Sequence, residues 1–278
     1  MIQSIYKQDL FKDKVVLVTG GGSGIGLRIT KELLFLGAHV VIAGRNEEKL
    51  NLATEALQDY RHQLSTVSCN IREEQQVDHA VDKILSQHNQ IDFLVNNAGG
   101  QFPQPADQMK IKGWRAVIDT NLNGTFIVSQ KIYKQSMKRT GGAIVNILAN
   151  MWNGFPDMCH TGAARAGVEN LTKTLATEWG PEGVRINSVA PGVIRSSGFD
   201  TYDEDFTAYL KTTPKDNKAY RFGTEAEVAA AVLFLLSPAA NFITGETIKV
   251  DGGEPLYSPK FPHKEHGKMA PWDGTGKF

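Results

Sequence analysis

A glycine-rich string near the start of the chain restricts its possible folds more than any other feature. Thr19-Gly20-Gly21-Gly22-Ser23-Gly24-Ile25-Gly26 follows a run of β-branched residues and leads directly into a helical pattern. Glycine suits such a turn because the backbone must take positive φ, approach a diphosphate closely and let the helix pack tightly on the strand. The N–H groups at the start of the helix would then hold the diphosphate. A plain turn can also carry glycines, but the position between a strand and a helix favours a dinucleotide site.

Short apolar runs alternate with amphipathic stretches along most of the chain. The expected strands are 15–18, 39–43, 64–69, 93–96, 143–148, 184–189 and 247–250, and the expected helices include 25–36, 47–60, 73–87, 113–137, 163–179 and 225–236. This alternation predicts parallel strands joined by crossover helices. We therefore expect an α/β chain with a single-domain, doubly wound Rossmann fold, in which helices flank a seven-stranded parallel sheet. Thr224 and Glu227 predict a capping box at the start of the last helix.

The length of 278 residues, of which 41% are hydrophobic, suits one domain of this type. We expect it to span residues 1–254, with a polar lid at 196–222 and an extended tail at 255–278. Thirty basic residues balance thirty acidic ones without a basic cluster, so nucleic acid is not an expected partner. No apolar run is long enough for a membrane span and no signal peptide is recognisable. Cys69 and Cys159 form no disulfide framework or metal motif, which favours a cytoplasmic protein without a metal site.

The end of the second expected strand bears on the choice of dinucleotide. Enzymes that use NAD place an acidic residue there against the ribose hydroxyls, whereas this chain has Ala43-Gly44-Arg45-Asn46. Arg45 can form charge-assisted hydrogen bonds to a 2′-phosphate, which favours NADP(H). The preference depends on Arg45 alone, because Ser23 in the glycine loop is not basic. The alternative is that Arg45 is simply a solvated residue at the start of a helix.

Further motifs, in their order along the chain, resemble those of the short-chain dehydrogenases/reductases over roughly residues 11–254. The motifs are Asn96-Asn97-Ala98-Gly99, Asn121-Leu122-Asn123-Gly124, Pro191-Gly192, Ile243-Thr244-Gly245 and Val250-Asp251-Gly252-Gly253. The resemblance implies that Asn96 and Ala98 line the cofactor, that Asn121 anchors an active-site water, and that residues 191–196 contact the nicotinamide amide. It also implies a homo-oligomer, a tetramer, formed through the helices at 113–137 and 163–179.

The expected cofactor-binding residues combine the glycine loop, Arg45 and the positions that the resemblance supplies. The full set is Gly20, Gly22, Ser23, Gly24, Ile25, Gly26, Arg45, Asn70, Ile71, Asn97, Ala98, Gly99, Pro191, Gly192, Ile194 and Ser196. At Asn70 the family usually has an aspartate facing the adenine. We expect the adenine contact to be kept, because an asparagine can still accept a hydrogen bond.

The chain departs from the family at its catalytic positions. The family pattern requires a serine after the fifth strand, then a tyrosine, and a lysine four residues after the tyrosine. Alignment on the flanking motifs puts Ala149, Thr161 and Arg165 at these three positions. None of the seven tyrosines is followed by a lysine four residues later, so no displaced pair replaces them. Of the family's four catalytic residues only Asn121 is present.

Within the family, the segments Asn96–Phe102 and His160–Val168 most resemble the peroxisomal trans-2-enoyl-CoA reductases, and the 2,4-dienoyl-CoA reductases more distantly. The former carry a tyrosine where this chain has Glu169, so a second tyrosine-lysine pair with Lys173 is also missing. Glu169 and Lys173 have helical i, i+4 spacing and are expected to form a surface ion pair.

The missing tyrosine changes the expected chemistry. Carbonyl reduction produces a strongly basic alkoxide and requires a positioned acid. Reduction of the C=C bond of an enoyl thioester spreads charge into an enolate, which requires hydrogen-bond donors at the thioester oxygen. We therefore expect an NADP(H)-dependent enoyl-thioester reductase, acting on acyl-CoA. Thr161 would bind the oxygen, Arg165 would orient the cofactor ribose, and water at Asn121 would supply the proton.

Several alternatives stay open at this point. Thr161 and Arg165 are purely structural in one of them, and in another His160 is the proton donor. Tyr202 or Tyr209 could enter the site with the lid, and basic lid residues could meet CoA phosphates. At the level of function, the alternatives are an NADP(H)-dependent carbonyl or alcohol dehydrogenase and a cofactor-binding protein with little catalysis.

Overall fold

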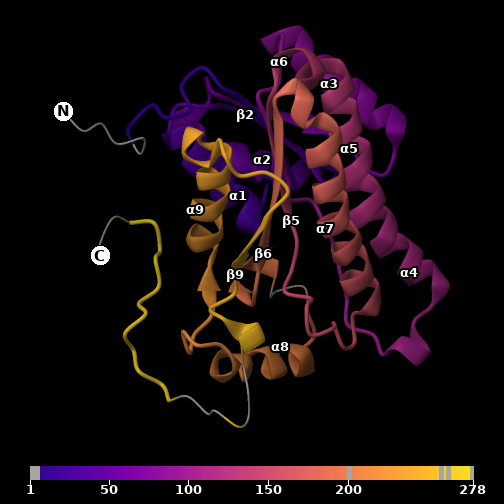
Figure 1. The fold of residues 1–278 in the computed structure, drawn as a ribbon, viewed down its shortest axis with the longest axis vertical. Helices are drawn as coiled ribbons and strands as arrows, with labels where there is room; N and C mark the ends of the chain where they lie inside the picture. The colour runs from indigo at the N-terminus through magenta and orange to yellow at the C-terminus, as the bar shows by residue number, and fades with distance from the viewer. Residues whose placement is uncertain (1–6, 199–201, 257–259, 261–263, 276–278) are drawn as a thin grey trace.

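A computed structural model describes residues 7–198, 202–256, 260 and 264–275 (Figure 1). Its central element is a parallel sheet of seven strands in the order β3-β2-β1-β4-β5-β6-β9. The strands are β1 (Val15–Thr19), β2 (His39–Gly44), β3 (Leu64–Ser68), β4 (Phe93–Asn96), β5 (Gly142–Ile147), β6 (Val184–Pro191) and β9 (Thr247–Val250). The sequence prediction of a seven-stranded, doubly wound sheet is confirmed, with strand ends shifted by at most two residues.

Helices cover both faces of this sheet. They are α1 (Gly24–Phe35), α2 (Glu47–Ala56), α3 (Glu74–His88), α4 (Ile111–Ile118), α5 (Gly124–Ile132), α6 (Lys138–Thr140), α7 (Cys159–Trp179), α8 (Glu204–Leu210) and α9 (Glu225–Leu236). The capping box at the start of α9 is present as predicted: Thr224 accepts from the Glu227 N–H and Glu227 accepts from the Thr224 N–H. Among the described helices, none is long and apolar enough to cross a membrane.

Two helices differ from their predicted extents in ways that affect the site. The helix expected at 113–137 is interrupted by π-helical turns at Asp119–Asn123 and Tyr133–Met137. The first turn contains Asn121, whose carbonyl accepts a hydrogen bond from the Thr125 hydroxyl at 2.9 Å. Helix α7 begins four residues earlier than expected, which places His160 and Thr161 on the helix. A π-turn inserts a residue into the helical repeat, and apolar periodicity does not reveal it.

The predicted lid segment is residues 196–222, of which 199–201 lie outside the described residues; it contains α8 and a 3-10 turn at Thr213–Asp216. A short parallel ribbon of β7 (Ile194–Arg195) and β8 (Gly223–Thr224) flanks the segment at both of its ends. The described tail, residues 264–275, runs back along the base of this segment, and we refer to it as the tail strap. Arg221 Nε donates to the Met269 carbonyl at 2.7 Å, and Thr224 Oγ1 donates to the Trp272 carbonyl at 2.5 Å. The strap is therefore attached to the lid base and to the start of α9.

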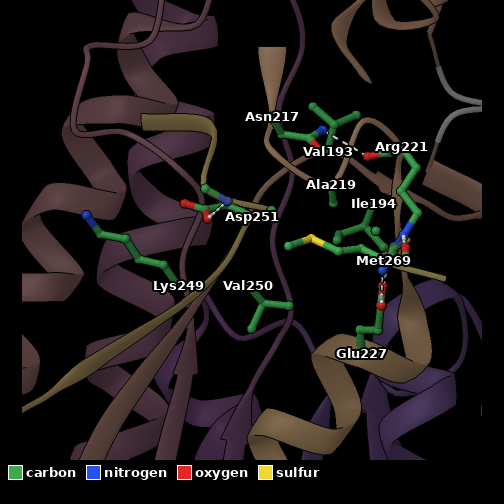
Figure 2. A pocket seen from close by; sticks show the side chains of 13 residues that line it. Val193, Ile194, Asn217, Ala219, Arg221, Glu227, Lys249, Val250, Asp251 and Met269 are labelled. Carbon is green, nitrogen blue, oxygen red and sulfur yellow. Dashed lines mark hydrogen bonds and ion pairs between the residues drawn. The ribbon is translucent and has the colours of Figure 1, made fainter. Parts of the chain in front are cut away.

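A cavity of about 300 Å³ lies between the lid base, the end of β9 and the tail strap. Figure 2 shows the Met269 side chain reaching into the middle of the lining residues, toward Ile194 and Val250. The same cavity is bounded by Arg221, which forms a two-pronged ion pair with Glu227 at 2.6 and 2.9 Å. The strap therefore forms one wall of this cavity.

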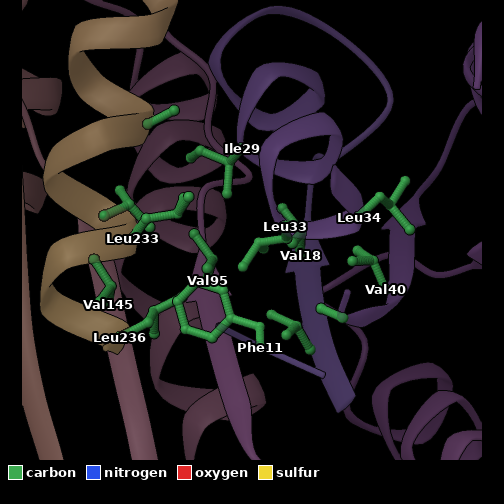
Figure 3. Packing of buried hydrophobic residues seen from close by; sticks show 14 of the residues in the cluster. Phe11, Val18, Ile29, Leu33, Leu34, Val40, Val95, Val145, Leu233 and Leu236 are labelled. Carbon is green, nitrogen blue, oxygen red and sulfur yellow. The ribbon is translucent and has the colours of Figure 1, made fainter. Parts of the chain in front are cut away.

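Apolar side chains on both faces of the sheet hold the helices in place. In β1, Val16 and Val18 face α1 and α9, whereas Val15 and Leu17 belong to the core beneath α3, α5 and α7. Figure 3 shows the first of these cores, in which Ile29 of α1 lies among residues of the central strands. Strands buried on both faces are continuously apolar, which is typical of parallel sheets. The carboxyl ends of these strands consequently form a fixed edge on which the site is built.

Candidate functional site

The glycine loop connects β1 to α1 at the carboxyl edge of the sheet. Gly20 and Gly24 have positive φ values of 67° and 55°. A Cβ at Gly26 would collide with the carbonyl oxygen of Gly20, and one at Gly20 would lie 2.9 Å from Asn97 Nδ2. Ser23 precedes α1 without a side-chain cap, so its hydroxyl does not occupy the first N–H groups of the helix. Backbone geometry, close packing and uncapped helix N–H groups together form a cradle that fits a dinucleotide diphosphate.

The remaining loop residues define the walls of this cradle. Gly22 lies over the start of α2, where a Cβ would meet the Lys49 carbonyl at 3.3 Å. Ile25 is partly buried and packs against the core beside α9. Asn97 donates from Nδ2 to the carbonyls of Thr19 and Gly20, at 3.0 and 3.2 Å. Asn97 therefore holds the shape of the loop.

Asn96 and Ala98, which were both expected to line the cofactor, have hydrogen-bond partners in different places. The backbone N–H of Ala98 donates to Thr19 Oγ1 at 3.0 Å, directly beside the glycine loop. The Asn96 side chain, however, is 4% exposed and donates to Ser129 Oγ at 2.9 Å and to Asn146 Oδ1 at 2.8 Å. The Asn96 amide therefore pairs with groups beneath the site, and the expectation that Asn96 lines the cofactor stays a prediction.

The residues expected at the adenosine end of the cofactor, Arg45, Asn70 and Ile71, follow β2 and β3 at the carboxyl edge of the sheet. Arg45 is exposed, directly after the end of β2. Asn70 Oδ1 accepts from the N–H and Nε of Arg72, at 3.3 and 3.2 Å. The oxygen that was expected to accept a hydrogen bond from adenine is thus already engaged with Arg72. Ile71 is 7% exposed and packs where Gly124 has no side chain.

Residues 191–196 lead from the end of β6 past the glycine loop. A Cβ on Gly192 would lie 2.8 Å from Asp251 Cα, so this backbone runs directly against the end of β9. Ile194 is 6% exposed, and Ser196 Cβ lies 3.9 Å from the Cβ position of Gly24. Pro191 accepts from the Asn150 N–H at 3.0 Å, which ties this segment to the loop after β5. The segment expected at the nicotinamide therefore lies beside the expected diphosphate site.

Arg165 is the central charged group among the three catalytic candidates. Its side chain reaches from α7 to the carbonyl of Ile147, to which Nη1 donates at 2.7 Å. A Cβ on Gly99 would collide with Arg165 Nη2 and lie 2.8 Å from Asn121 Oδ1. The glycine therefore allows two of the three candidates to meet.

The environment of Arg165 is unfavourable for a positive charge. The residue is 8% exposed, and burial lowers the pKa of its guanidinium to about 10. Nε has no hydrogen-bond partner, and no carboxylate in the described part of the chain forms an ion pair with Arg165. A buried cation without a counter-ion favours an anion placed beside it.

Asn121 forms two hydrogen bonds with the main chain of the loop that follows Gly99. Its Oδ1 accepts from the Gly100 N–H at 2.9 Å and its Nδ2 donates to the Gly100 carbonyl at 2.8 Å. Asn121 is fully buried, so both ends of its amide are used in holding this loop. Its predicted association with an active-site water stays a prediction.

Thr161, the third candidate, is fully buried beside His160. Its Oγ1 lies 3.3 Å from His160 Nδ1, which also accepts the Thr161 N–H at 2.8 Å. Because Nδ1 accepts this bond, a neutral imidazole carries its proton on Nε2. Burial lowers the pKa of His160, which favours the neutral ring. The His160 ring in turn lies edge to face with Phe102 at 4.7 Å between centroids.

A chain of buried polar groups beneath the site was not foreseen. Asn146 Nδ2 donates to Thr172 Oγ1 at 2.9 Å, and Thr172 Oγ1 lies 2.8 Å from Ser188 Oγ. With the Asn96 amide, these side chains link β4, β5, β6 and α7. The available signal was the presence of Asn146 and Ser188 within otherwise apolar strands, since buried polar groups require partners.

Three other features of the sequence analysis concern a surface ion pair, the lid segment and a metal site. Glu169 and Lys173 form the expected ion pair at 3.3 Å. Gln101 Nε2 donates to the Tyr202 hydroxyl at 2.7 Å, so the lid segment touches the loop that follows Gly100. Among the described residues, no group of three or more His, Cys, Asp or Glu side chains is arranged to hold a metal ion.

Comparisons with known proteins agree with this geometry. The family model described as enoyl-(acyl carrier protein) reductase matches residues 20–254. A peroxisomal 2,4-dienoyl-CoA reductase of Danio rerio is 38% identical, over 91% of this chain and 85% of its own length. A probable 2,4-dienoyl-CoA reductase of Bacillus subtilis is 37% identical, over 87% of this chain and 96% of its own.

A solved structure extends the comparison. The citronellol catabolism dehydrogenase of Pseudomonas aeruginosa is 45% identical, with a TM-score of 0.80 over 91% of this chain and 99% of its own. The glycine cradle, the sheet order and these matches agree with one another. The chain belongs to the short-chain dehydrogenase/reductase family, and it is an oxidoreductase enzyme of the kind that uses a nicotinamide cofactor.

Proposed function

We propose that this enzyme uses NADPH to reduce the C=C bond of an enoyl thioester, with an acyl-CoA as its substrate. The observation that carries the proposal is the Arg165 guanidinium, buried without a carboxylate partner in the described chain. A fixed positive charge suits an enolate, whose negative charge is spread over the thioester oxygen. The two 2,4-dienoyl-CoA reductases at 38% and 37% identity support this choice of substrate class.

The residues present fit a nicotinamide dinucleotide. The glycine cradle would hold the diphosphate, and Arg45 at the end of β2 would face the adenosine 2′-phosphate. The bound cofactor supplies hydride to the β-carbon of the enoyl group. Arg45 is exposed and is therefore available for a charged group of the ligand.

Side chains of the enzyme would stabilise the negative charge of the enolate and hold the source of the proton. Arg165 would orient the cofactor ribose and provide a positive field, since its guanidinium stays charged and is held by the Ile147 carbonyl. The Thr161 hydroxyl would donate to the thioester oxygen. Asn121 would keep the Gly99–Gly100 loop in place and thereby keep the space beside Arg165 open. Water held near Asn121 would be the source of the proton in this scheme.

Replacement of Thr161 by valine tests the proposed oxygen site. Thr161→Val keeps the β-branched shape and removes the hydroxyl, so kcat for enoyl-CoA reduction should fall by about 100- to 1000-fold. Thr174→Val is the matched control, because Thr174 lies exposed on the same helix and its hydroxyl donates to the Asn170 carbonyl within that helix. The assay follows NADPH absorbance with crotonyl-, decenoyl- and dienoyl-CoA. Unchanged reduction by Thr161→Val would remove Thr161 from the mechanism.

Substitution of Arg45 tests the cofactor preference. Arg45→Glu places a carboxylate against the 2′-phosphate, so the ratio of kcat/KM for NADPH over NADH should fall by about 100-fold or more. Arg61→Glu is the control, because it alters an exposed arginine whose Nε donates to its neighbour His62. An unchanged ratio in Arg45→Glu would assign the preference to other residues.

A carbonyl or alcohol dehydrogenase is the second candidate. The citronellol catabolism dehydrogenase, 45% identical to this chain, supports it. Aliphatic ketones with NADPH and terpenoid alcohols with NADP⁺ are therefore assayed beside the enoyl-CoA substrates. Faster turnover of these compounds than of any enoyl thioester would favour the second candidate, and cofactor binding without any turnover would contradict both.

We further propose a homotetramer in the cytoplasm. Ile111 and Phe126 leave 64% and 38% of their surfaces exposed on α4 and α5, where burial against another copy is favourable. Cys69 and Cys159 are free thiols, which suits a reducing compartment. Light scattering of Phe126→Glu against the unmodified chain tests the assembly, and an unchanged mass would exclude this face from the interface.

A further inference from the structure

The site lacks a tyrosine at the family's catalytic position, although the chain has tyrosines elsewhere. Those placed by the structure lie in different surroundings. Tyr133 stacks on Trp179 at 4.1 Å between centroids, Tyr60 packs against a core, and Tyr209 is 61% exposed. Among the described tyrosines, Tyr202 is the one whose hydroxyl is hydrogen-bonded to the loop after Gly100.

The hydrogen bond leaves the Tyr202 proton available. Gln101 Nε2 is the donor and the phenol oxygen is the acceptor, at 2.7 Å. No described group accepts the hydroxyl proton of Tyr202 within hydrogen-bonding distance. The ring itself is held by Phe206 on α8, with 4.9 Å between centroids. The phenol is therefore positioned by two contacts, and its O–H is free to donate.

The position of Gln101 connects this hydroxyl with the catalytic cluster, that is, the candidates Asn121, Thr161 and Arg165. On one side of Gln101, Gly100 is gripped at both its N–H and its carbonyl by Asn121. On the other side, Phe102 packs on His160, which contacts Thr161. Gln101 thus lies between two residues that each touch the cluster, and Tyr202 meets the rim of the site at this point.

We propose that Tyr202 is the proton donor of this enzyme, supplied from the lid segment instead of from α7. After hydride transfer to the β-carbon, the O–H bond of Tyr202 breaks and its proton bonds to the α-carbon of the enolate. The electron pair of the enolate forms that C–H bond, and the phenolate left on Tyr202 takes a proton from water. Gln101 positions the phenol and donates to the phenolate oxygen as it forms. In this scheme Tyr202 supplies the proton that the proposed function otherwise takes from water near Asn121.

The inference deepens the proposed function, but its chemistry requires only the hydride transfer of the family. If the substrate is a ketone, the same phenol protonates the alkoxide oxygen. Three variants separate donation from positioning. Tyr202→Phe removes the hydroxyl and keeps the ring on Phe206, Gln101→Leu removes the contact that positions it, and Tyr209→Phe is a matched control on α8.

Steady-state kinetics with NADPH are measured for each variant on enoyl-CoA substrates and on aliphatic ketones. General acid catalysis contributes about 10²- to 10⁴-fold, so Tyr202→Phe should lower kcat by at least about 100-fold with little change in the Kd of NADPH. Gln101→Leu should lower kcat by about 10-fold or less, and Tyr209→Phe should match the unmodified enzyme. Equal melting temperatures show that the variants are folded.

Two results obtained with an active unmodified enzyme would overturn the inference. One is a kcat for Tyr202→Phe within threefold of the unmodified enzyme. The other is a fall in kcat for Gln101→Leu as large as that for Tyr202→Phe. Such a result would mean that the hydrogen bond between Gln101 and Tyr202 only holds the lid segment in place and that the hydroxyl has a structural role. If the unmodified enzyme reduces ketones and not thioesters, the proposed function fails, and the role of Tyr202 is decided on the ketone. Absence of turnover on every substrate overturns both.

Discussion

Replacing Arg165 by methionine is expected to make the protein more stable and inactive. The guanidinium is 8% exposed, has no carboxylate partner in the described chain, and has a pKa that burial lowers from the ordinary arginine range to about 10. At about 1.4 kcal/mol per pH unit, this fall corresponds to a destabilisation of the folded state by about 3 kcal/mol. Because the folded pKa lies below the unfolded one, the cost is present at every pH below about 10 and disappears as the pH rises through the ordinary arginine range.

The bond from Nη1 to the Ile147 carbonyl offsets part of this cost. A charge-assisted hydrogen bond contributes about 1.5–3 kcal/mol, and the bond here is 2.7 Å long. Methionine fills a similar volume without a charge. The difference leaves a net stabilisation of about 1 kcal/mol in Arg165→Met, equivalent to a rise in Tm of about 2–4 °C.

Thermal and urea unfolding of the cofactor-free protein, at one fixed protein concentration, measure this effect. Arg185→Met is the matched control, because Arg185 is only partly buried and donates to the carbonyls of Leu235 and Leu236 at the end of α9, so its replacement removes these hydrogen bonds and relieves a smaller burial cost. That control should unfold at a lower temperature. A cofactor-free Arg165→Met that unfolds below the unmodified protein would refute the reasoning that this charge is uncompensated.

Three further perturbations have distinct expected outcomes. Gly26→Ala should raise the Kd of NADPH at least about tenfold in a fluorescence titration, because its Cβ pushes α1 away from the glycine loop; an unchanged Kd would contradict the close-packing argument. Gly99→Ala should lower kcat more than cofactor affinity, because its Cβ displaces Arg165, and kinetics with equal losses in both would count against this. For Glu227, burial opposes ionisation, but hydrogen bonds from Arg221 and from backbone groups outweigh it and lower the pKa. The ionised Glu227 carboxylate therefore contributes its full stabilisation of the fold above the ordinary carboxyl range, and this stabilisation is lost as the pH falls through the lowered pKa. Glu227→Gln should make the free energy of unfolding less dependent on pH below about pH 4. An unchanged pH dependence in that range would exclude the Arg221–Glu227 ion pair as its source.

Much of the fold was predictable because its determinants are local. Each strand is an apolar run that parallel sheets require on both faces, and the capping box of α9 is encoded within four residues. The glycine string predicted its own geometry, since Gly20 and Gly24 adopt the positive φ that such turns need. These features depend on neighbours in the chain and are therefore visible in the sequence.

The features that were missed depend on contacts between distant residues. The hydrogen bonds of the Asn96 amide to Ser129 and Asn146, which lie on other elements, could not be read from the sequence. The early start of α7 places Thr161 against His160, and the His160 ring packs on Phe102, more than fifty positions earlier. Likewise, the vacancy of the tyrosine position could be read from the sequence, whereas the meeting of Tyr202 with Gln101 could not.

The tail strap is attached to the lid base largely through its main chain. Met269, Ala270 and Trp272 present backbone carbonyls to Arg221 and Thr224, and any amino acid offers such a carbonyl. The family model that matches this chain ends at residue 254, before the strap begins. In evolutionary terms, most positions of the strap other than Met269 can therefore diverge in sequence while these main-chain contacts are kept. Selection at this part of the molecule would act mainly on the length and course of the tail. A comparison of side chains among relatives would therefore underestimate how strongly the strap is conserved as a structural element.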